Sequence, residues 1–242
     1  MERAYHRWFS NALQRNMELL VFGHAGRAIL FFPTRMARFY DYENWGIVGS
    51  LFEKLEHGEL QLFCVDSIDA ESFYNKNIHP AGRIARYIQY ESYLINEVLP
   101  LMRKTNHGNR LDVAGCSMGA YHAVNLGLKH PELFTKVTGM SGRYDLTIQL
   151  PNYDDLFDGY RNEDIYFNMP LQYMSNLTDE HLIDTIKKLN ITLVIGETDP
   201  FLPGNQAFSD LLWHKGIAHK FYIWDHDAHR PKYWRQMVKF YL

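Results

Sequence analysis

The feature that most constrains this chain is a short apolar strand that runs directly into a glycine-flanked serine turn and then into a helix. The segment reads LDVAGCSMGA over residues 111–120, and its centre, GCSMG, places Ser117 at the turn. In a G-x-S-x-G turn the serine needs a strained backbone that lifts its hydroxyl clear of a sheet, and the glycines leave room for neighbouring backbone. Chance supplies this pentapeptide in roughly one chain in ten to twenty of this length, so the surrounding sequence must decide its meaning.

The predicted elements around this turn alternate between strands and helices. Apolar runs predict strands at 60–66, 111–114, 136–140, 191–196 and 220–224. Amphipathic runs and their end signals predict helices at 43–57, 81–104, 118–129, 205–215 and from about residue 232. Two further strands, at 17–23 and 28–33, are joined by a tight turn and predict an antiparallel hairpin that opens the sheet. The alternation predicts an α/β fold with a mostly parallel sheet and helices on both faces.

The length and composition predict a single domain over residues 1–242, because the chain is long enough for one sizeable core and holds no linker, repeat or low-complexity tract. Between about 143 and 190 the alternation is interrupted by a segment rich in Tyr, Asn and Asp. We interpret it as an insertion over the carboxyl ends of the strands, where an open α/β sheet binds its ligand; an ordinary surface excursion explains it equally well. Its aromatic side chains either line a pocket or pack the segment onto the body, and they are Tyr153, Phe157, Tyr160, Tyr166 and Phe167.

The charge pattern excludes several classes of partner. The net charge is −3, and interspersed acidic and basic residues give no footprint for nucleic acid or an anionic membrane. The first twenty residues are too charged for a signal peptide, and no later segment reaches membrane-spanning length. The two cysteines, Cys64 and Cys116, fit free thiols in a reducing compartment. We therefore expect a cytoplasmic protein that acts on a small polar or amphipathic substrate, and a homo-oligomer is compatible with this sequence.

A nucleophilic serine needs a base that takes its proton and an acid that orients the base. The loop GETDP after the strand at 191–195 offers Asp199 at its bend, which we favour over Glu197, which lies nearer the strand. The segment WDHDAH after the last strand offers His226 and His229, and we favour His229 as the base. Two histidines at this spacing could also bind a metal ion, but no convincing third ligand lies nearby in sequence. We therefore predict no metal and no cofactor.

The same chemistry needs N–H donors for the developing oxyanion. In this architecture one donor is the backbone N–H of the residue after the nucleophile, Met118. The other comes from the loop after the strand at 29–32, which reads PTRMARFY. Arg35 is the favoured donor in that loop, and Met36 is the second choice.

At these residues the chain resembles the putative-esterase group of α/β-hydrolases, which includes esterase D (S-formylglutathione hydrolase), feruloyl esterases and antigen 85 mycolyltransferases. The likeness is carried by short motifs along nearly the whole chain: GHAG at 23–26, FPT at 32–34, RFYDYE at 38–43, ESFY at 71–74, YESY at 90–93, EVLP at 97–100, GCSMGAYH at 115–122, SG at 141–142 and YW at 233–234. The chain looks closest to small bacterial cytoplasmic esterases. The resemblance implies the α/β-hydrolase fold and carboxylic ester hydrolysis. In the family a histidine is followed at the fifth position by tryptophan, a spacing that His229 and Trp234 keep and His226 does not.

Two departures from the family pattern lie beside the predicted catalytic groups. Similar proteins carry Asp-Trp-Pro where this chain has RPK at 230–232, and small residues where it has RMA at 35–37. Arg35 and Arg230 lie in these two loops, and Arg143 lies in a third loop that is expected near the site. They predict a substrate whose carboxylate or phosphate a guanidinium binds in bidentate fashion, with solvated loop arginines as the alternative. Arg143, Arg230 and Met36 are the candidates for substrate binding.

The leading hypothesis from the sequence is a serine carboxylic ester hydrolase. Ser117 attacks the acyl carbon, His229 transfers the proton, and Asp199 orients His229. The amides of Met118 and Arg35 bind the oxyanion. A thioesterase or an acyltransferase would use the same acyl-enzyme, and a non-catalytic binding protein that keeps the fold is the alternative from another class.

Overall fold

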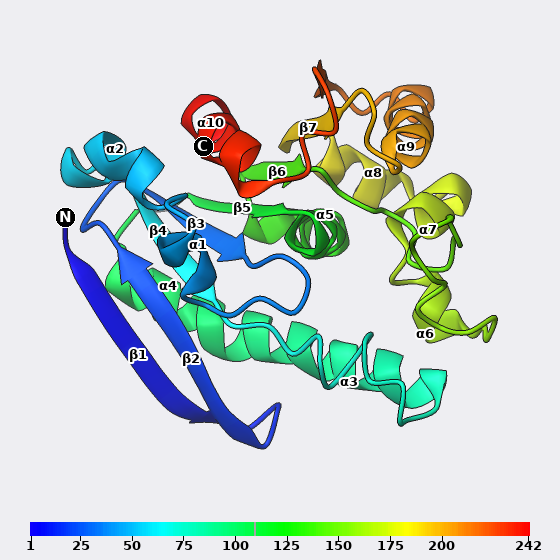
Figure 1. Ribbon diagram of the computed structural model, residues 1–242, viewed down its shortest axis with the longest axis horizontal. Coiled ribbons are helices and arrows are strands. Elements are labelled where there is room, and N and C mark those ends of the chain that lie inside the picture. Colours follow the sequence, from blue (N-terminus) through cyan, green and yellow to red (C-terminus); the bar gives the residue numbers. More distant parts are fainter. Residues whose placement is uncertain (109) are drawn as a thin grey trace.

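The computed structural model describes residues 1–108 and 110–242, and over these residues it contains an eight-stranded sheet with helices on both faces (Figure 1). The strand order is β1-β2-β4-β3-β5-β6-β7-β8. The strands are β1 (Arg3–Ser10), β2 (Arg15–Phe22), β3 (Arg27–Phe32), β4 (Leu60–Val65), β5 (Leu111–Cys116), β6 (Lys136–Met140), β7 (Asn190–Gly196) and β8 (His219–Trp224). In this order all neighbours from β4 to β8 are parallel, whereas β2 pairs antiparallel with both β1 and β4. The predicted α/β-hydrolase architecture is confirmed.

The antiparallel hairpin at the N-terminus is present, but it is built from other strands than we predicted. It pairs β1 with β2, from Arg3 opposite Phe22 to Ser10 opposite Arg15. The predicted pairing of strands 17–23 and 28–33 is wrong, because β4 lies between β2 and β3. At Gly26 φ is +86°, and the next residue donates its N–H to the carbonyl of Glu59 at 3.1 Å, so the turn directs β3 alongside β4. The sequence pattern missed β1 because this edge strand is largely exposed and carries charged residues.

Several predicted helices have the expected bounds, and one is broken. The long helix near 81–104 is a continuous run of α3 (Pro80–Tyr93), a π-helical turn (Leu94–Val98) and α4 (Leu99–Thr105). The π turn precedes Pro100, which has no N–H to continue regular α-helical bonding. The predicted helix at 43–57 is wrong as one element: it is split into α1 (Asp41–Asn44), a 3₁₀ turn (Gly49–Leu51) and α2 (Phe52–Glu56). The break follows Gly46, whose φ of +70° is incompatible with a continuing helix.

The sheet is buried on both faces, as its apolar strands predict. Alternate residues of β3 belong to opposite cores: Leu30 and Phe32 pack with α5 (Met118–Lys129), whereas Ile29 and Phe31 pack with α10 (Pro231–Tyr241). In Figure 1, α10 and α2 lie on one side of the sheet and α3, α4 and α5 on the other. The loops at the carboxyl ends of the central strands therefore extend from a sheet that is packed on both faces.

The segment between β6 and β7 carries three short helices, α6 (Glu163–Tyr166), α7 (Pro170–Asn176) and α8 (Glu180–Ile186), and α9 (Leu202–His214) follows β7. The aromatic side chains of the segment between β6 and β7 have different environments. Phe157 is fully buried against Phe73, with ring centroids 5.9 Å apart, whereas Phe167 is 56% exposed. Tyr160 packs on the ring of His79. In the part of the chain that the structure describes, no helix is both long and apolar enough to cross a bilayer.

Candidate active site

The serine turn connects β5 to α5 and is strained as the motif predicts. Ser117 has φ +56° and ψ −120°, a conformation that residues with a side chain rarely adopt. Its N–H donates to the carbonyl of Met140 at 2.8 Å. A Cβ added at Gly115 would lie 2.2 Å from the carbonyl oxygen of Gly119, and one added at Gly119 would lie 2.3 Å from that of Phe32. Both glycines are therefore required by close backbone approach.

We expect Gly119→Ala to lower the free energy of unfolding by about 3 kcal/mol, because the new methyl group must displace the backbone at the end of β3. Gly204→Ala is the matched control. Its added Cβ, also in a helix, points into open space, so we expect a gain of about 0.5 kcal/mol from helix propensity. Urea denaturation of the two variants measures the difference, and equal stabilities would contradict this account of the turn.

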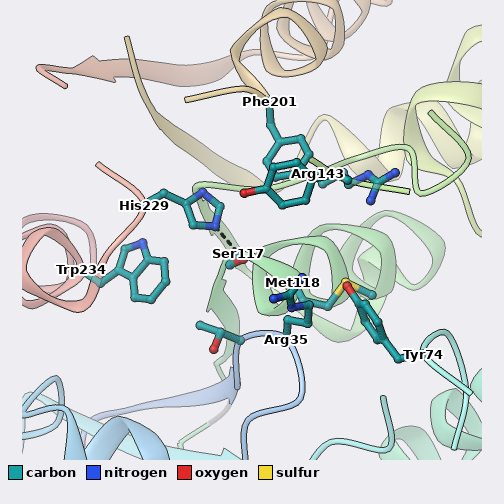
Figure 2. Close-up of a pocket in the computed structure, with 10 residues that line it drawn as sticks. Arg35, Tyr74, Ser117, Met118, Arg143, Phe201, His229 and Trp234 are labelled. Carbon is teal, nitrogen blue, oxygen red and sulfur yellow. Dashed lines mark hydrogen bonds between the residues drawn. The ribbon is translucent and has the colours of Figure 1, made fainter. Parts of the chain in front are cut away.

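Three of the predicted residues form one hydrogen-bonded chain. His229 Nε2 lies 2.8 Å from Ser117 Oγ, and His229 Nδ1 lies 2.7 Å from Asp199 Oδ2 (Figure 2 draws the first of these contacts). The Asp199 side chain is completely buried, and its other oxygen accepts the N–H of Phe201 at 2.9 Å. The loops after β5, β7 and β8 thus bring together a hydroxyl, an imidazole and a carboxylate from the same edge of the sheet.

The alternative residues, Glu197 and His226, lie outside this chain of contacts. Glu197 is exposed, and its Oε1 accepts the backbone N–H of His226 at 3.0 Å. His226 is exposed as well and has φ +64°. The two rivals therefore brace the loop after β8 against the loop after β7, and neither contacts Ser117.

The loop that carries His229 is held by Trp234 and Ser141. The Trp234 ring packs against the His229 ring with centroids 5.6 Å apart, and its Nε1 donates to Ser141 Oγ at 3.1 Å. Ser141 Oγ in turn donates to the carbonyl of Ala228 at 3.1 Å. The spacing of histidine and tryptophan and the Ser141-Gly142 motif therefore have a common physical role, which is to fix the imidazole.

The two favoured oxyanion donors have free amides. Within residues 1–108 and 110–242, neither the backbone N–H of Met118, at the first turn of α5, nor that of Arg35 donates to another group of the chain. The N–H of Met36 is occupied, because it donates to Asp69 Oδ2 at 3.0 Å. The structure therefore leaves Arg35 rather than Met36 as the available donor in the loop after β3.

Sequence reasoning missed the groups that hold this loop. Asp69 is 1% exposed, and besides Met36 it contacts His122 Nε2 at 3.3 Å. His122 is itself buried and lies on α5 one turn beyond the serine. One signal could have found Asp69: it follows the carboxyl end of a predicted strand, the edge at which functional side chains of parallel sheets gather.

A second missed group lies on the opposite face of the sheet. The buried Tyr42 hydroxyl donates to the carbonyl of Phe32 at 2.7 Å and accepts the N–H of Cys116 at 3.0 Å. It therefore links the end of β3 to the end of β5.

The two cysteines, Cys116 and Cys64, are both buried and unpaired. Burial raises the pKa of each thiol, so a thiolate nucleophile is disfavoured at neutral pH.

A cavity of about 250 Å³ opens at the serine. It is lined by Thr34, Arg35, Tyr74, Ser117, Met118, Arg143, Tyr153, Phe201, His229 and Trp234 (Figure 2). Of the three side chains predicted to bind substrate, Arg143 lines the cavity, whereas Met36 and Arg230 do not. The Arg230 side chain is 69% exposed and pairs with Asp227 at 3.3 Å.

Arg143 is buried under the segment that follows β6. Its Nε and Nη2 donate to the carbonyls of Asp145 at 3.2 Å, Leu146 at 3.3 Å and Asp154 at 2.8 Å, and also to that of Ile148. The guanidinium carbon lies 5.6 Å from the centroid of the Phe201 ring. Burial lowers the pKa of Arg143, since water no longer solvates its charge fully.

Comparison with known proteins agrees with this geometry. A family model described as "Putative esterase" matches residues 41–235. A ferulic acid esterase is similar in structure, with a TM-score of 0.78 and 18% identity over 98% of this chain and 94% of that one. So is an S-formylglutathione hydrolase from Staphylococcus aureus, with a TM-score of 0.68 and 16% identity over 99% of this chain and 97% of that one. An S-formylglutathione hydrolase from Agrobacterium tumefaciens is also similar, with a TM-score of 0.70 and 15% identity over 99% of this chain and 94% of that one.

At such identities the solved structures show a shared fold. Among curated proteins no sequence matches this chain. The family model, however, spans most of the sequence, including the serine turn and the loops that carry Asp199 and His229. The chain therefore belongs to the putative esterase family of α/β-hydrolases and is a carboxylesterase-type hydrolase.

Proposed function

We propose that this protein hydrolyses small carboxylic esters through a covalent acyl-enzyme formed on Ser117. The observation that carries the proposal is the continuous contact from Ser117 Oγ through His229 to the buried carboxylate of Asp199, at the floor of a cavity. A cavity of about 250 Å³ suits a small substrate. Arg143 and Tyr153 reach that cavity from the segment 143–190, which supports its interpretation as an insertion over the site.

In the first step the hydroxyl proton of Ser117 moves to His229 Nε2 while Oγ bonds to the ester carbonyl carbon. The carbonyl π electrons become a lone pair on oxygen, which the N–H groups of Met118 and Arg35 bind. The N-terminus of α5 adds a partial positive charge at the same place. When the tetrahedral intermediate collapses, the protonated imidazole gives its proton to the leaving alkoxide, and the alcohol departs.

In the second step water takes the place of the alcohol. His229 accepts a proton from the water, whose oxygen attacks the acyl carbon, and then returns a proton to Ser117 Oγ as the carboxylic acid leaves. Asp199 keeps the Nδ1 proton of the imidazole in place, so that Nε2 presents its lone pair to the serine. Its burial strengthens the attraction to the imidazolium that forms in each step.

A fluorophosphonate probe tests the nucleophile without knowledge of the natural ester. We expect the intact protein to acquire one adduct, located by mass spectrometry on the peptide that contains Ser117, because the activated Oγ displaces fluoride from phosphorus. Ser117→Ala removes the adduct, whereas Ser175→Ala, a change on the exposed face of α7, keeps it. Failure of the folded wild-type protein to react would favour a binding protein that keeps the fold without its chemistry.

A further inference from the structure

The cavity at Ser117 is more positive than the chain around it. Two arginines are among its lining residues, and none of the lining residues is Asp or Glu. The chain as a whole has a net charge of −3, so the sign of the cavity does not follow from composition. The carboxylate of Asp199 is not among the lining groups, because it lies behind His229 and pairs with its Nδ1. A site with positive walls favours an anion.

Arg143 is the first of these arginines and is unusual for a buried guanidinium. It is 9% exposed, yet in the described part of the chain no carboxylate oxygen lies within 4.0 Å of it. Carbonyl oxygens satisfy the N–H groups on Nε and Nη2, but dipoles do not cancel a full charge. Burial lowers the pKa of Arg143 and outweighs the charges of Asp145, Asp154 and Asp155, which act from beyond that distance and favour its charged form. An anion in direct contact with the guanidinium would therefore stabilise this buried cation further.

Arg35 is the second arginine, and it differs from Arg38 in the same loop, whose charge is balanced by ion pairs. Arg38 pairs with Asp66 at 2.7 Å and with Glu18 at 2.8 Å. Arg35 forms no ion pair within the described residues, and its guanidinium carbon lies 5.8 Å from the centroid of the Tyr74 ring. Its charge is therefore available to a molecule in the cavity.

Tyr74 completes the group. Burial raises the pKa of its phenol and the charge of Asp69 adds to this, whereas the charges of Arg35 and Arg143 act in the opposite direction. The phenol therefore remains a proton donor at neutral pH and feels both guanidinium charges. Asp69 itself does not line the cavity: its buried carboxylate accepts the N–H of Met36 and contacts His122, so it does not occupy the place of an anionic ligand.

We propose that Arg35, Tyr74 and Arg143 form a subsite for an anionic group of the ester substrate, either a carboxylate or a phosphate. Figure 2 places Tyr74 and the Arg143 guanidinium on the side of Ser117 that lies away from Trp234. Because the cavity is small, the anion must lie only a few bonds from the ester carbonyl. The inference rests on the proposed function, since it assigns the substrate of the same serine.

Matched esters test the subsite. On the acyl side, 4-nitrophenyl hemiglutarate is compared with its neutral methyl ester, and a 3-phosphonopropionate ester distinguishes phosphate from carboxylate. On the alcohol side, 4-acetoxybenzoate is compared with its methyl ester. The readout is the ratio of kcat/KM between the anionic and the neutral member of a pair. Since the Arg35 amide serves both members, any disturbance of the oxyanion donors cancels in this ratio.

We expect the wild-type ratio to favour the anion for at least one pair, and Arg35→Gln to reduce that ratio about tenfold, the effect of losing one charged hydrogen bond. Arg230→Gln, which removes an arginine outside the cavity, leaves the ratio unchanged. If Arg35→Gln leaves the ratio of kcat/KM unchanged, the subsite proposal is wrong. The proposed ester hydrolysis is not affected by that result.

If wild-type protein hydrolyses none of these esters, the proposed function fails, and the subsite is then tested by binding alone. Isothermal titration with glutarate is expected to give at least tenfold weaker binding to Arg35→Gln than to wild type. Equal affinities, or no binding to either protein, overturn the subsite independently of catalysis.

Discussion

Replacement of Ser117 by alanine is expected to reduce kcat for a 4-nitrophenyl ester by roughly 10⁶-fold, the scale seen when a serine nucleophile is removed. The reason is that Ser117 is the group proposed to form the acyl-enzyme, and the adjacent Cys116 cannot replace it, because burial raises the pKa of its thiol. The fold should survive, because Ser117 Oγ bonds only to His229 among the described residues, and alanine meets the same backbone strain at φ +56°.

Ser175→Ala is the control for this measurement. Its hydroxyl is exposed and donates only to the carbonyl of Leu171 within α7, so turnover should stay at the wild-type value. Circular dichroism of both variants confirms folding. A Ser117→Ala protein that keeps even a few per cent of the wild-type kcat would remove the serine from the mechanism.

Asp199→Asn is expected to lower kcat by about 10⁴-fold although it replaces only one non-hydrogen atom. A carboxamide can place its NH₂ group against Nδ1 of His229, where the carboxylate oxygen now lies at 2.7 Å. The imidazole would then carry its proton on Nε2 and could not accept the proton of Ser117. KM should change little, since Asp199 is buried behind His229 and does not line the cavity.

Glu197→Gln is the matched substitution two residues earlier. Its side chain accepts the backbone N–H of His226, a bond that a glutamine oxygen can keep, so kcat should stay within about twofold. Steady-state kinetics on the two variants separates the rival carboxylates. The reverse pattern, with Glu197→Gln inactive and Asp199→Asn active, would assign the acid to Glu197.

The elements nearest the serine were the most predictable from sequence. The helix predicted at 118–129 has those bounds in the structure, because the turn fixes its start and Pro131 limits its end. That Asp199 and His229 lie close to Ser117 was predictable because each follows an apolar strand, and parallel strands present their carboxyl ends at one edge. Local signals therefore sufficed wherever a strand end fixed the position of the side chain.

Features that depend on distant parts of the chain were not predictable in this way. The pairing of β2 with β4 instead of β3 joins residues about forty positions apart, which periodicity cannot specify. The contact of Asp69 with Met36 and the bonds of Arg143 to backbone carbonyls likewise depend on how loops fold over the sheet. For the arginines, sequence reasoning gave the residue type and the neighbourhood, whereas three-dimensional packing separated Arg35 and Arg143 from Arg230.

The bridge made by Tyr42 has a consequence for how enzymes on this scaffold diversify. Its hydroxyl links the end of β3, which leads into the loop of Arg35, to the end of β5, which leads into the turn of Ser117, and Tyr42 itself does not line the cavity. Several walls of the cavity, by contrast, are side chains of other segments, among them Tyr74, Tyr153 and Phe201. Changes in those walls can select a new ester without loosening the geometry of attack, so reaction geometry and substrate choice can evolve separately in this protein.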